Sequence, residues 1–248
     1  GDAIDALKIT PRVKVKNDNI SMIGKNNMSV MVDDKLILLS GDELINFLKS
    51  IPSDNIKNIE VISTPPAKYD AEGNSGLINI KLKKSKLNQW NASLRSSYIQ
   101  STYPKGSFGG NFDYQKNKLS LYSNLNYVNG SNAPVETNKI YYPLGLWSEE
   151  NKRRDFQNSL NGRIGADYKA SEKWSVGLQY LGSFSKPRIT ENSLTSIYTQ
   201  INSYLNTLSE NLVKNNNHSL NLNSTVVFDT IGKKMNINLD YFEFKNDN

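Results

Sequence analysis

Hydrophobic and polar residues alternate almost one by one through most of the chain after residue 87. In seven segments, one set of alternate positions is apolar or aromatic and the other is mainly Asn, Ser or charged. A period of two is typical of a β-strand that has one apolar face and one polar face. The predicted strands cover residues 90–98, 107–115, 118–127, 155–168, 174–185, 220–229 and 235–241.

The connections between these segments alternate in length. They are short at 116–117, 169–173 and 230–233, long at 129–154 and 186–217, and moderate at 99–105. Outer-membrane barrels place short turns on one side of the membrane and long loops on the other. A soluble antiparallel sandwich also alternates polar and apolar residues, but its strands are usually shorter and its connections need not alternate in length. The pattern therefore favours barrel strands, with the soluble sandwich as the alternative.

Aromatic residues support the membrane interpretation, because they lie near the ends of most apolar faces, where the two membrane interfaces would be. They are Trp90, Tyr98, Tyr127, Phe156, Tyr168, Trp174, Phe228 and Tyr241. Seven strands with open edges would leave backbone groups unpaired in lipid, and a barrel wide enough to enclose a small domain needs about 22 strands. We therefore expect the chain to be part of a longer protein.

The first third of the chain has a different pattern. Ser40 and Glu43 have the spacing of a capping box, which predicts that a helix begins there, and Pro52 ends it. The apolar positions at helical spacing are Leu44, Phe47, Leu48 and Ile51. Strands are predicted at 20–23, 29–32, 59–62 and 77–82, with a turn at Asp33-Asp34. This region therefore reads as a small α/β domain.

An ordered set of short segments in this region resembles the plug domain of TonB-dependent outer-membrane receptors. The set consists of Gly24, Val30-Met31-Val32-Asp33, Ile51-Pro52, Ile56, Ile59-Glu60-Val61, Pro65-Pro66, Tyr69 and Gly76-Leu77-Ile78-Asn79-Ile80. Residues 64–73 are most similar to a branch found in Bacteroidetes. Asp34 stands where the family usually has a glycine after the aspartate, and Asp70 stands where a glycine is frequent.

The resemblance, which covers residues 4–84, implies a fold and a division of the chain. The expected fold class is an α+β plug domain at 1–86, followed at 87–248 by the first seven antiparallel strands of a transmembrane β-barrel, which is truncated here. Such receptors bind a nutrient at the cell surface and import it across the outer membrane of a Gram-negative bacterium. The expected partners are outer-membrane lipid, the nutrient ligand, a TonB-type energising complex whose contact segment lies upstream of Gly1, and a surface lipoprotein.

Candidate ligand residues follow from that topology. Plug loops 24–28, 33–35 and 67–75 would face the ligand, and Tyr141, Tyr142 and Trp147 lie in the long 129–154 connection, where an interface anchor is not needed. The plug-loop candidates are Lys25, Asn26, Asn27, Asp33, Asp34, Lys68, Tyr69 and Asp70.

Composition limits the other functions. The chain has no Cys and one His, so it offers no zinc spacing, no cysteine nucleophile and no Ser-His-Asp set, and we expect neither an enzyme nor a cofactor. The net charge of +6 comes from scattered lysines, which favours a solvated surface over a nucleic-acid partner. Two other functions stay open: a non-transporting outer-membrane barrel or adhesin, and a soluble β-rich binding module.

Overall fold

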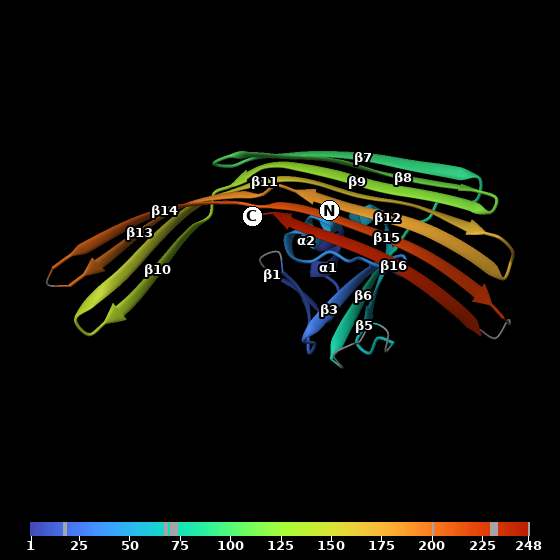
Figure 1. The fold of residues 1–248 in the computed structure, drawn as a ribbon, viewed down its shortest axis with the longest axis horizontal. Helices are drawn as coiled ribbons and strands as arrows, with labels where there is room; N and C mark the ends of the chain where they lie inside the picture. Colours follow the sequence, from blue (N-terminus) through green and yellow to red (C-terminus); the bar gives the residue numbers. More distant parts are fainter. Residues whose placement is uncertain (17–18, 67–68, 70–73, 200, 229–232, 248) are drawn as a thin grey trace.

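The computed structural model describes residues 1–16, 19–66, 69, 74–199, 201–228 and 233–247. The fold is mainly β, with antiparallel pairing in almost every ladder and two α-helices in the described ranges. One long, arched sheet lies over a compact unit built from the first 82 residues, which we call the small unit (Figure 1).

The small unit begins with helix α1 (Ala3–Lys8), which the sequence pattern did not predict. Asp2 and Asp5 form a complete capping box at its start, and Ala3, Ile4 and Leu7 are buried. Strands β1 (Val13–Lys16) and β2 (Asn19–Met22) form a separate antiparallel pair.

A four-stranded sheet forms the centre of the small unit, in the order β4-β3-β6-β5. Its strands are β3 (Asn27–Val32), β4 (Lys35–Leu36), β5 (Ile56–Ile62) and β6 (Ser75–Leu82), and β3 runs parallel to β6. The predicted turn joins β3 to β4: Asp33 and Asp34 have φ of 53° and 66°, the left-handed conformation that a tight hairpin requires.

The predicted helix is α2 (Gly41–Lys49), followed by a short 3₁₀ turn, η1 (Ser53–Asn55). It buries Phe47 and Leu48 in the core of the small unit, as the apolar spacing indicated, and Ile51 just after it is also buried. Ile45 is buried although it was not predicted, and Leu44 is only partly buried. The capping box predicted for it was wrong. Ser40 occupies the N-cap position, but its side chain makes no capping hydrogen bond. Glu43 instead accepts a hydrogen bond from Asn217, because the large sheet passes close to this end of the helix.

The large sheet contains a continuous antiparallel series of seven strands, β7-β8-β9-β11-β12-β15-β16, which we call the wall. Its strands are β7 (Gln89–Gln100), β8 (Pro104–Lys116), β9 (Leu119–Asn132), β11 (Gly145–Lys169), β12 (Trp174–Ser185), β15 (Lys214–Val227) and β16 (Lys234–Asp247). Each corresponds to one of the seven predicted strands. Most are longer than the prediction because pairing continues past the apolar stretch.

The two long connections were predicted as loops, and that was wrong. They form β10 (Val135–Tyr142), β13 (Arg188–Tyr198) and β14 (Ser203–Leu212), which pair with the first half of β11 in the order β10-β11-β13-β14. We call this extension the blade. It projects beyond the small unit at the left of Figure 1. The strands could form here because β11, with 25 residues, is long enough to serve both the wall and the blade.

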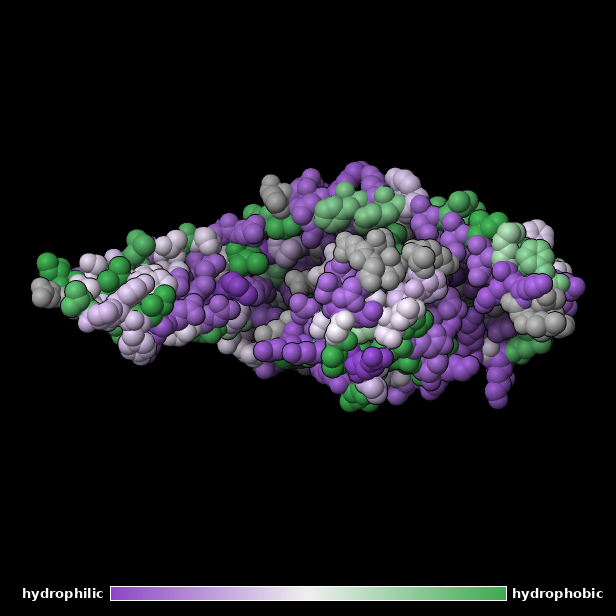
Figure 2. Space-filling view, turned by 90° about the horizontal axis from the view of Figure 1, so that it is seen from below, coloured by the Kyte–Doolittle hydropathy of each residue, from purple (hydrophilic) through white to green (hydrophobic). Residues whose placement is uncertain are grey.

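The two faces of the wall differ in polarity. On its concave face, toward the small unit, most buried side chains are polar: Asn161 is 1% exposed and Gln179 is 2% exposed. Val128 and Leu181 are buried apolar residues of the wall. On its convex face, neighbouring residues are apolar and exposed: Leu178 is 48% exposed and Ile164 is 59% exposed. Seen from the side of the small unit, the surface is mostly hydrophilic, with apolar residues in separate patches (Figure 2). The wall is therefore the reverse of a water-soluble sheet, which buries its apolar face.

In the described part of the chain, neither helix is long and apolar enough to cross a membrane.

Candidate functional site

The contact between the small unit and the concave face of the wall is the most elaborate polar site in the described residues. It has three parts: the Asp33–Lys35 turn, the two ends of helix α2, and the segment after β6. Among the described residues of the wall, Leu181 of β12 is the one that joins the buried apolar core of the small unit. Hydrogen bonds and an ion pair also join the two regions.

The turn between β3 and β4 contributes a buried lysine. The Lys35 ammonium is 2.8 Å from Asp167 Oδ1 on β11 and donates a hydrogen bond of 2.5 Å to the Tyr122 hydroxyl on β9. The same ammonium lies 4.9 Å from the centre of the Tyr122 ring. Lys35 is only 8% exposed, so removing Asp167 would leave a buried charge without its counter-ion.

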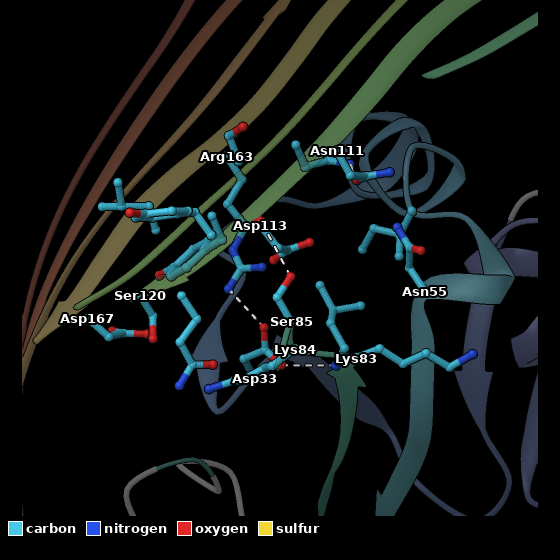
Figure 3. A pocket seen from close by; sticks show the side chains of 18 residues that line it. Asp33, Asn55, Lys83, Lys84, Ser85, Asn111, Asp113, Ser120, Arg163 and Asp167 are labelled. Atoms are coloured by element: carbon cyan, nitrogen blue, oxygen red, sulfur yellow. Dashed lines mark hydrogen bonds and ion pairs between the residues drawn. The ribbon is translucent and has the colours of Figure 1, made fainter. Parts of the chain in front are cut away.

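Arg163 of β11 is a second charged wall residue that contacts the turn between β3 and β4. Its Nη2 lies 3.5 Å from Asp33 Oδ2 and 3.5 Å from the Val32 carbonyl oxygen, and its Nε donates to Gln179 Oε1 at 2.8 Å. The guanidinium also stacks 4.5 Å from the Tyr122 ring centre. Figure 3 shows Arg163 pointing from the wall toward Asp33 across a small cavity of about 40 Å³. The cationic residues of both regions therefore meet around one tyrosine.

Two glycines make room for this arrangement. A Cβ atom at Gly165 would lie 2.3 Å from the Tyr122 ring, and one at Gly177 would lie 2.2 Å from Asp167 Oδ1. Because both glycines lack a side chain, Tyr122 and Asp167 lie flat against the neighbouring strand and still reach Lys35. The local sequence of β11 and β12 therefore shapes the site as directly as the charged residues do.

Helix α2 is tied to the wall at both ends. At its C-terminal end, the Ser50 hydroxyl donates to Asn124 Oδ1 at 2.6 Å, and Asn124 Nδ2 donates to the Ser50 carbonyl at 3.2 Å. Arg95 of β7 donates to the Lys49 carbonyl, one of the acceptors left without a helical partner at a helix end. At the N-terminal end, Glu43 accepts from Asn217 of β15.

Asp34 has its hydrogen-bond and ion-pair partners within the small unit. Its carboxylate lies 2.5 Å from the Lys81 ammonium and accepts from Asn79 Nδ2 at 2.8 Å. Burial acts to raise the pKa of Asp34, but the hydrogen bonds from Lys81 and Asn79 outweigh it, so the pKa lies below its ordinary value. Asp34 is therefore a paired carboxylate that fixes the turn to β6.

The structure does not bring the predicted ligand residues together. Lys25, Asn26 and Asn27 lie at the start of β3 or just before it, whereas Asp33 and Asp34 follow its end. The strand between them has six residues, which is about 20 Å. Tyr69 lies in the connection between β5 and β6, and its amide donates to the Pro66 carbonyl at 2.8 Å. Lys68 and Asp70 lie outside the described residues.

The three aromatic candidates lie in the blade, away from the small unit. Ile140 pairs with Trp147, whereas Tyr141 pairs with Leu146, so Trp147 and Tyr141 are on opposite faces of the β10–β11 hairpin. Tyr142 shares the face of Trp147. Tyr141 and Tyr142 are 77% and 59% exposed, which leaves both rings accessible.

Sequence reasoning included Lys35 only as part of the 33–35 plug loop, and it missed Tyr122, Arg163 and Asp167 as site residues. A signal was present, since Arg163 and Asp167 are charges on a strand face that is otherwise mainly Asn and Ser. Their partner in the small unit was not visible, because Lys35 and Asp167 are 132 residues apart in sequence. No protein-family model matches this chain, and no curated protein matches it in sequence.

Proposed function

We propose that this chain is the plug domain and part of the barrel of an outer-membrane receptor, similar to TonB-dependent receptors, that imports a nutrient ligand. In this proposal the small unit is the plug, the concave face of the wall lines the barrel interior, and the convex face contacts lipid. The chain has a transport function, with no catalysis and no cofactor of its own.

The observation that carries the proposal is the reversed polarity of the wall. Its concave face buries carboxamides, hydroxyls and Arg163, while its convex face exposes large apolar side chains in long alternating rows. Soluble monomers rarely expose apolar patches larger than a few hundred Å². A barrel strand in a bilayer has this arrangement, with apolar residues toward lipid and polar residues toward the interior. The same reversal weighs against a soluble sandwich.

Strand length and connection length support the same environment. Wall strands other than β11 have 12 to 14 residues, enough for a tilted strand to cross the hydrocarbon layer of a bilayer. The short connections after β8, β11 and β15 lie at one end of the wall, and the blade lies at the other end. We propose that the short turns face the periplasm and that the blade stands outside the cell.

The polar contact between plug and wall suits an import function. Hydrogen bonds and ion pairs join plug and wall in addition to Leu181, and each such bond contributes only about 1 kcal/mol net when water can replace it. A plug held this way can shift within the barrel without exposing its own apolar core. The proposed partners are the energising complex that would drive this shift, a surface lipoprotein, and the outer-membrane lipid around the wall.

A fractionation experiment tests the proposal. An antibody raised against this chain is used on separated membranes of the source cell, and the mass of the native protein is read from the blot. We expect a band of about 70–110 kDa in the outer-membrane fraction, the size of a complete plugged barrel. A soluble band near the 27.9 kDa of this chain would contradict the proposal.

A further inference from the structure

Strand β14 forms one edge of the blade and, among the described strands, pairs only with β13. All ten of its residues, Ser203–Leu212, are exposed. A strand at the edge of a sheet has alternate backbone N–H and C=O groups that point away from its single neighbour, and these groups can pair with another strand. The outer side of β14 is therefore a place where a further strand can add to the blade.

The two edges of the blade differ in how they are protected. Proteins commonly protect an edge strand with charged side chains or with proline. At the opposite edge, β10 carries Glu136 and Lys139, whereas β14 has one charged residue, Glu210, and no Lys, Arg or Pro. Glu210 lies 3.9 Å from Arg188 Nε on the neighbouring strand, so its charge has a partner inside the same sheet. The β14 edge is therefore nearly neutral.

β14 also exposes an apolar row on one face. Residues opposite each other on paired strands share a face, and the pairing of β11 with β13 and of β13 with β14 places the even-numbered residues of β14 on the convex side. Tyr204, Leu208 and Leu212 are 64%, 75% and 60% exposed there. Open backbone groups together with exposed apolar side chains are typical of an edge that pairs with another chain.

The order of residues along this face is self-complementary. We consider two copies of β14 paired antiparallel, with Leu208 of one opposite Leu208 of the other. Tyr204 of each copy then faces Leu212 of the other, and Asn206 faces Glu210 in the same way. Apolar pairs thus form at the centre and at both ends, a carboxamide meets the carboxylate between them, and the two glutamates do not face each other. A second copy of this chain therefore fits the edge in side-chain character as well as in backbone pairing.

The direction of the strands determines how two such copies are placed. The blade continues β11 beyond the wall, so its strands run on from strands that the proposed function places across the outer membrane (Figure 1). Antiparallel pairing reverses the direction of β14 between the copies, so the two blades meet and the two walls point away from each other. Two copies in one membrane have β14 running in the same direction. Antiparallel pairing therefore joins copies in two facing membranes.

We propose that β14 pairs antiparallel with β14 of a second copy in a facing membrane, so that the protein attaches cells to one another. The two blades then form one continuous sheet with the two copies of β14 at its centre. One pair of ten-residue strands is a small contact, so attachment depends on many copies acting together across the two membranes. The placement in facing membranes rests on the proposed function, whereas the strand pairing rests on the β14 edge alone.

Vesicle clustering tests the attachment. The full native protein is inserted, with the blade outward, into two vesicle populations that carry different fluorescent labels, and mixed clusters are counted by fluorescence cross-correlation. Leu208→Lys places two like charges opposite each other, so it should reduce mixed clusters by about tenfold or more. Leu194→Lys is the matched control, because it adds the same charge on the same face of the inner strand β13. It should leave clustering within about twofold of the unchanged protein.

Single cysteines test the register, after any Cys elsewhere in the full protein is replaced. Opposed residues of an antiparallel pair have Cα atoms about 4.5–5.5 Å apart, which a disulfide can bridge. Leu208→Cys should therefore form disulfide dimers with itself. Asn206→Cys should not, because its two copies lie four residues, or about 13 Å, apart along the strands. Vesicles with Asn206→Cys mixed with vesicles with Glu210→Cys should cross-link.

Four results would overturn the inference. They are unchanged clustering by Leu208→Lys, disulfides of equal yield in every cysteine combination, dimers that form only within single vesicles, and a lack of both clustering and cross-linking, which would mean that another part of the full protein covers the edge. Heat-dependent gel mobility confirms that each variant is folded. Fractionation keeps the two proposals apart: a protein outside the membrane refutes the membrane placement, whereas a membrane protein without clustering refutes only this inference.

Discussion

The small unit and the wall are made from one chain, yet they bury opposite kinds of residue. In the small unit, Phe47, Leu48 and Ile78 are fully buried, and the exposed surface is largely polar. In the wall, Ser183 and Asn161 are buried and Leu239 is 61% exposed. The small unit buries apolar residues, as a domain surrounded by water does, whereas the wall buries polar residues and exposes apolar ones. The proposed membrane placement accounts for this difference within a single protein.

We expect the largest change in stability from a substitution in the core of the small unit. Phe47→Ala removes a fully buried ring from helix α2 and should lower the free energy of unfolding of this unit by about 3–5 kcal/mol. The full chain is unfolded in denaturant, and cleavage of the small unit by a protease monitors its unfolding. Ile9→Ala is the control, because Ile9 is 85% exposed and should change stability by less than about 0.5 kcal/mol.

Two adjacent residues on β16 test whether the two faces of the wall have different surroundings. Leu239 lies on the convex face and Asn238 on the concave face, and both are exposed. Leu239→Arg should destabilise the protein in lipid vesicles by about 2–4 kcal/mol, because it places a charge in hydrocarbon. Asn238→Arg faces the polar interior and should be near neutral. Similar small effects for both substitutions would mean that the convex face contacts water.

The contact between the two regions should give an intermediate effect. Lys35→Met leaves the Asp167 carboxylate without its cation and should cost about 1–3 kcal/mol. The small unit should then become more sensitive to limited proteolysis while the wall stays resistant. A double-mutant cycle with Asp167→Asn should show coupling of about 0.5–3 kcal/mol. Strict additivity would show that the pair does not hold the regions together.

The smallest expected difference concerns the two helix starts in the small unit. Asp2→Ala removes a complete capping box from α1 and should cost about 1 kcal/mol. Ser40→Ala removes a side chain that makes no capping bond to α2, so its cost should stay below about 0.5 kcal/mol. Thermal unfolding of the two variants, compared side by side, measures the difference. Equal costs would mean that Ser40 does cap its helix.

The wall was predictable from sequence because its two faces differ. Segment 174–185 matches β12 residue for residue, since apolar and polar positions alternate along it except at Leu181-Gly182. The blade was not predictable in the same way. Apolar and polar residues do not alternate regularly in β10 or β14, and the leucines of β14 (Leu205, Leu208 and Leu212) are three and four residues apart, so neither strand has the period of two that would mark it. Helix α1 had a signal in Asp2 and Asp5, but six residues are too few for a clear helical period.

The polar site depends on long-range placement that a local pattern does not contain. The sequence indicated a turn at Asp33-Asp34 and a polar face containing Arg163, and the structure has both. It did not indicate that the turn would meet that strand, because the pairing of Lys35 with Asp167 depends on how the small unit sits under the sheet. Glu43 shows the same effect: tertiary contact with Asn217 replaced the expected local cap.

The most direct test of the reversed wall is a spin-label scan along β16 in the full protein in lipid vesicles. Single cysteines are introduced from Met235 to Tyr241; this chain has no Cys of its own, and any Cys elsewhere in the full protein is replaced first. Collision rates are then measured with oxygen, which concentrates in lipid, and with a water-soluble nickel complex. The account predicts oxygen maxima at Met235, Ile237, Leu239 and Tyr241 and minima at Asn236, Asn238 and Asp240. High accessibility to the nickel complex at the odd positions, or no alternation at all, would contradict it.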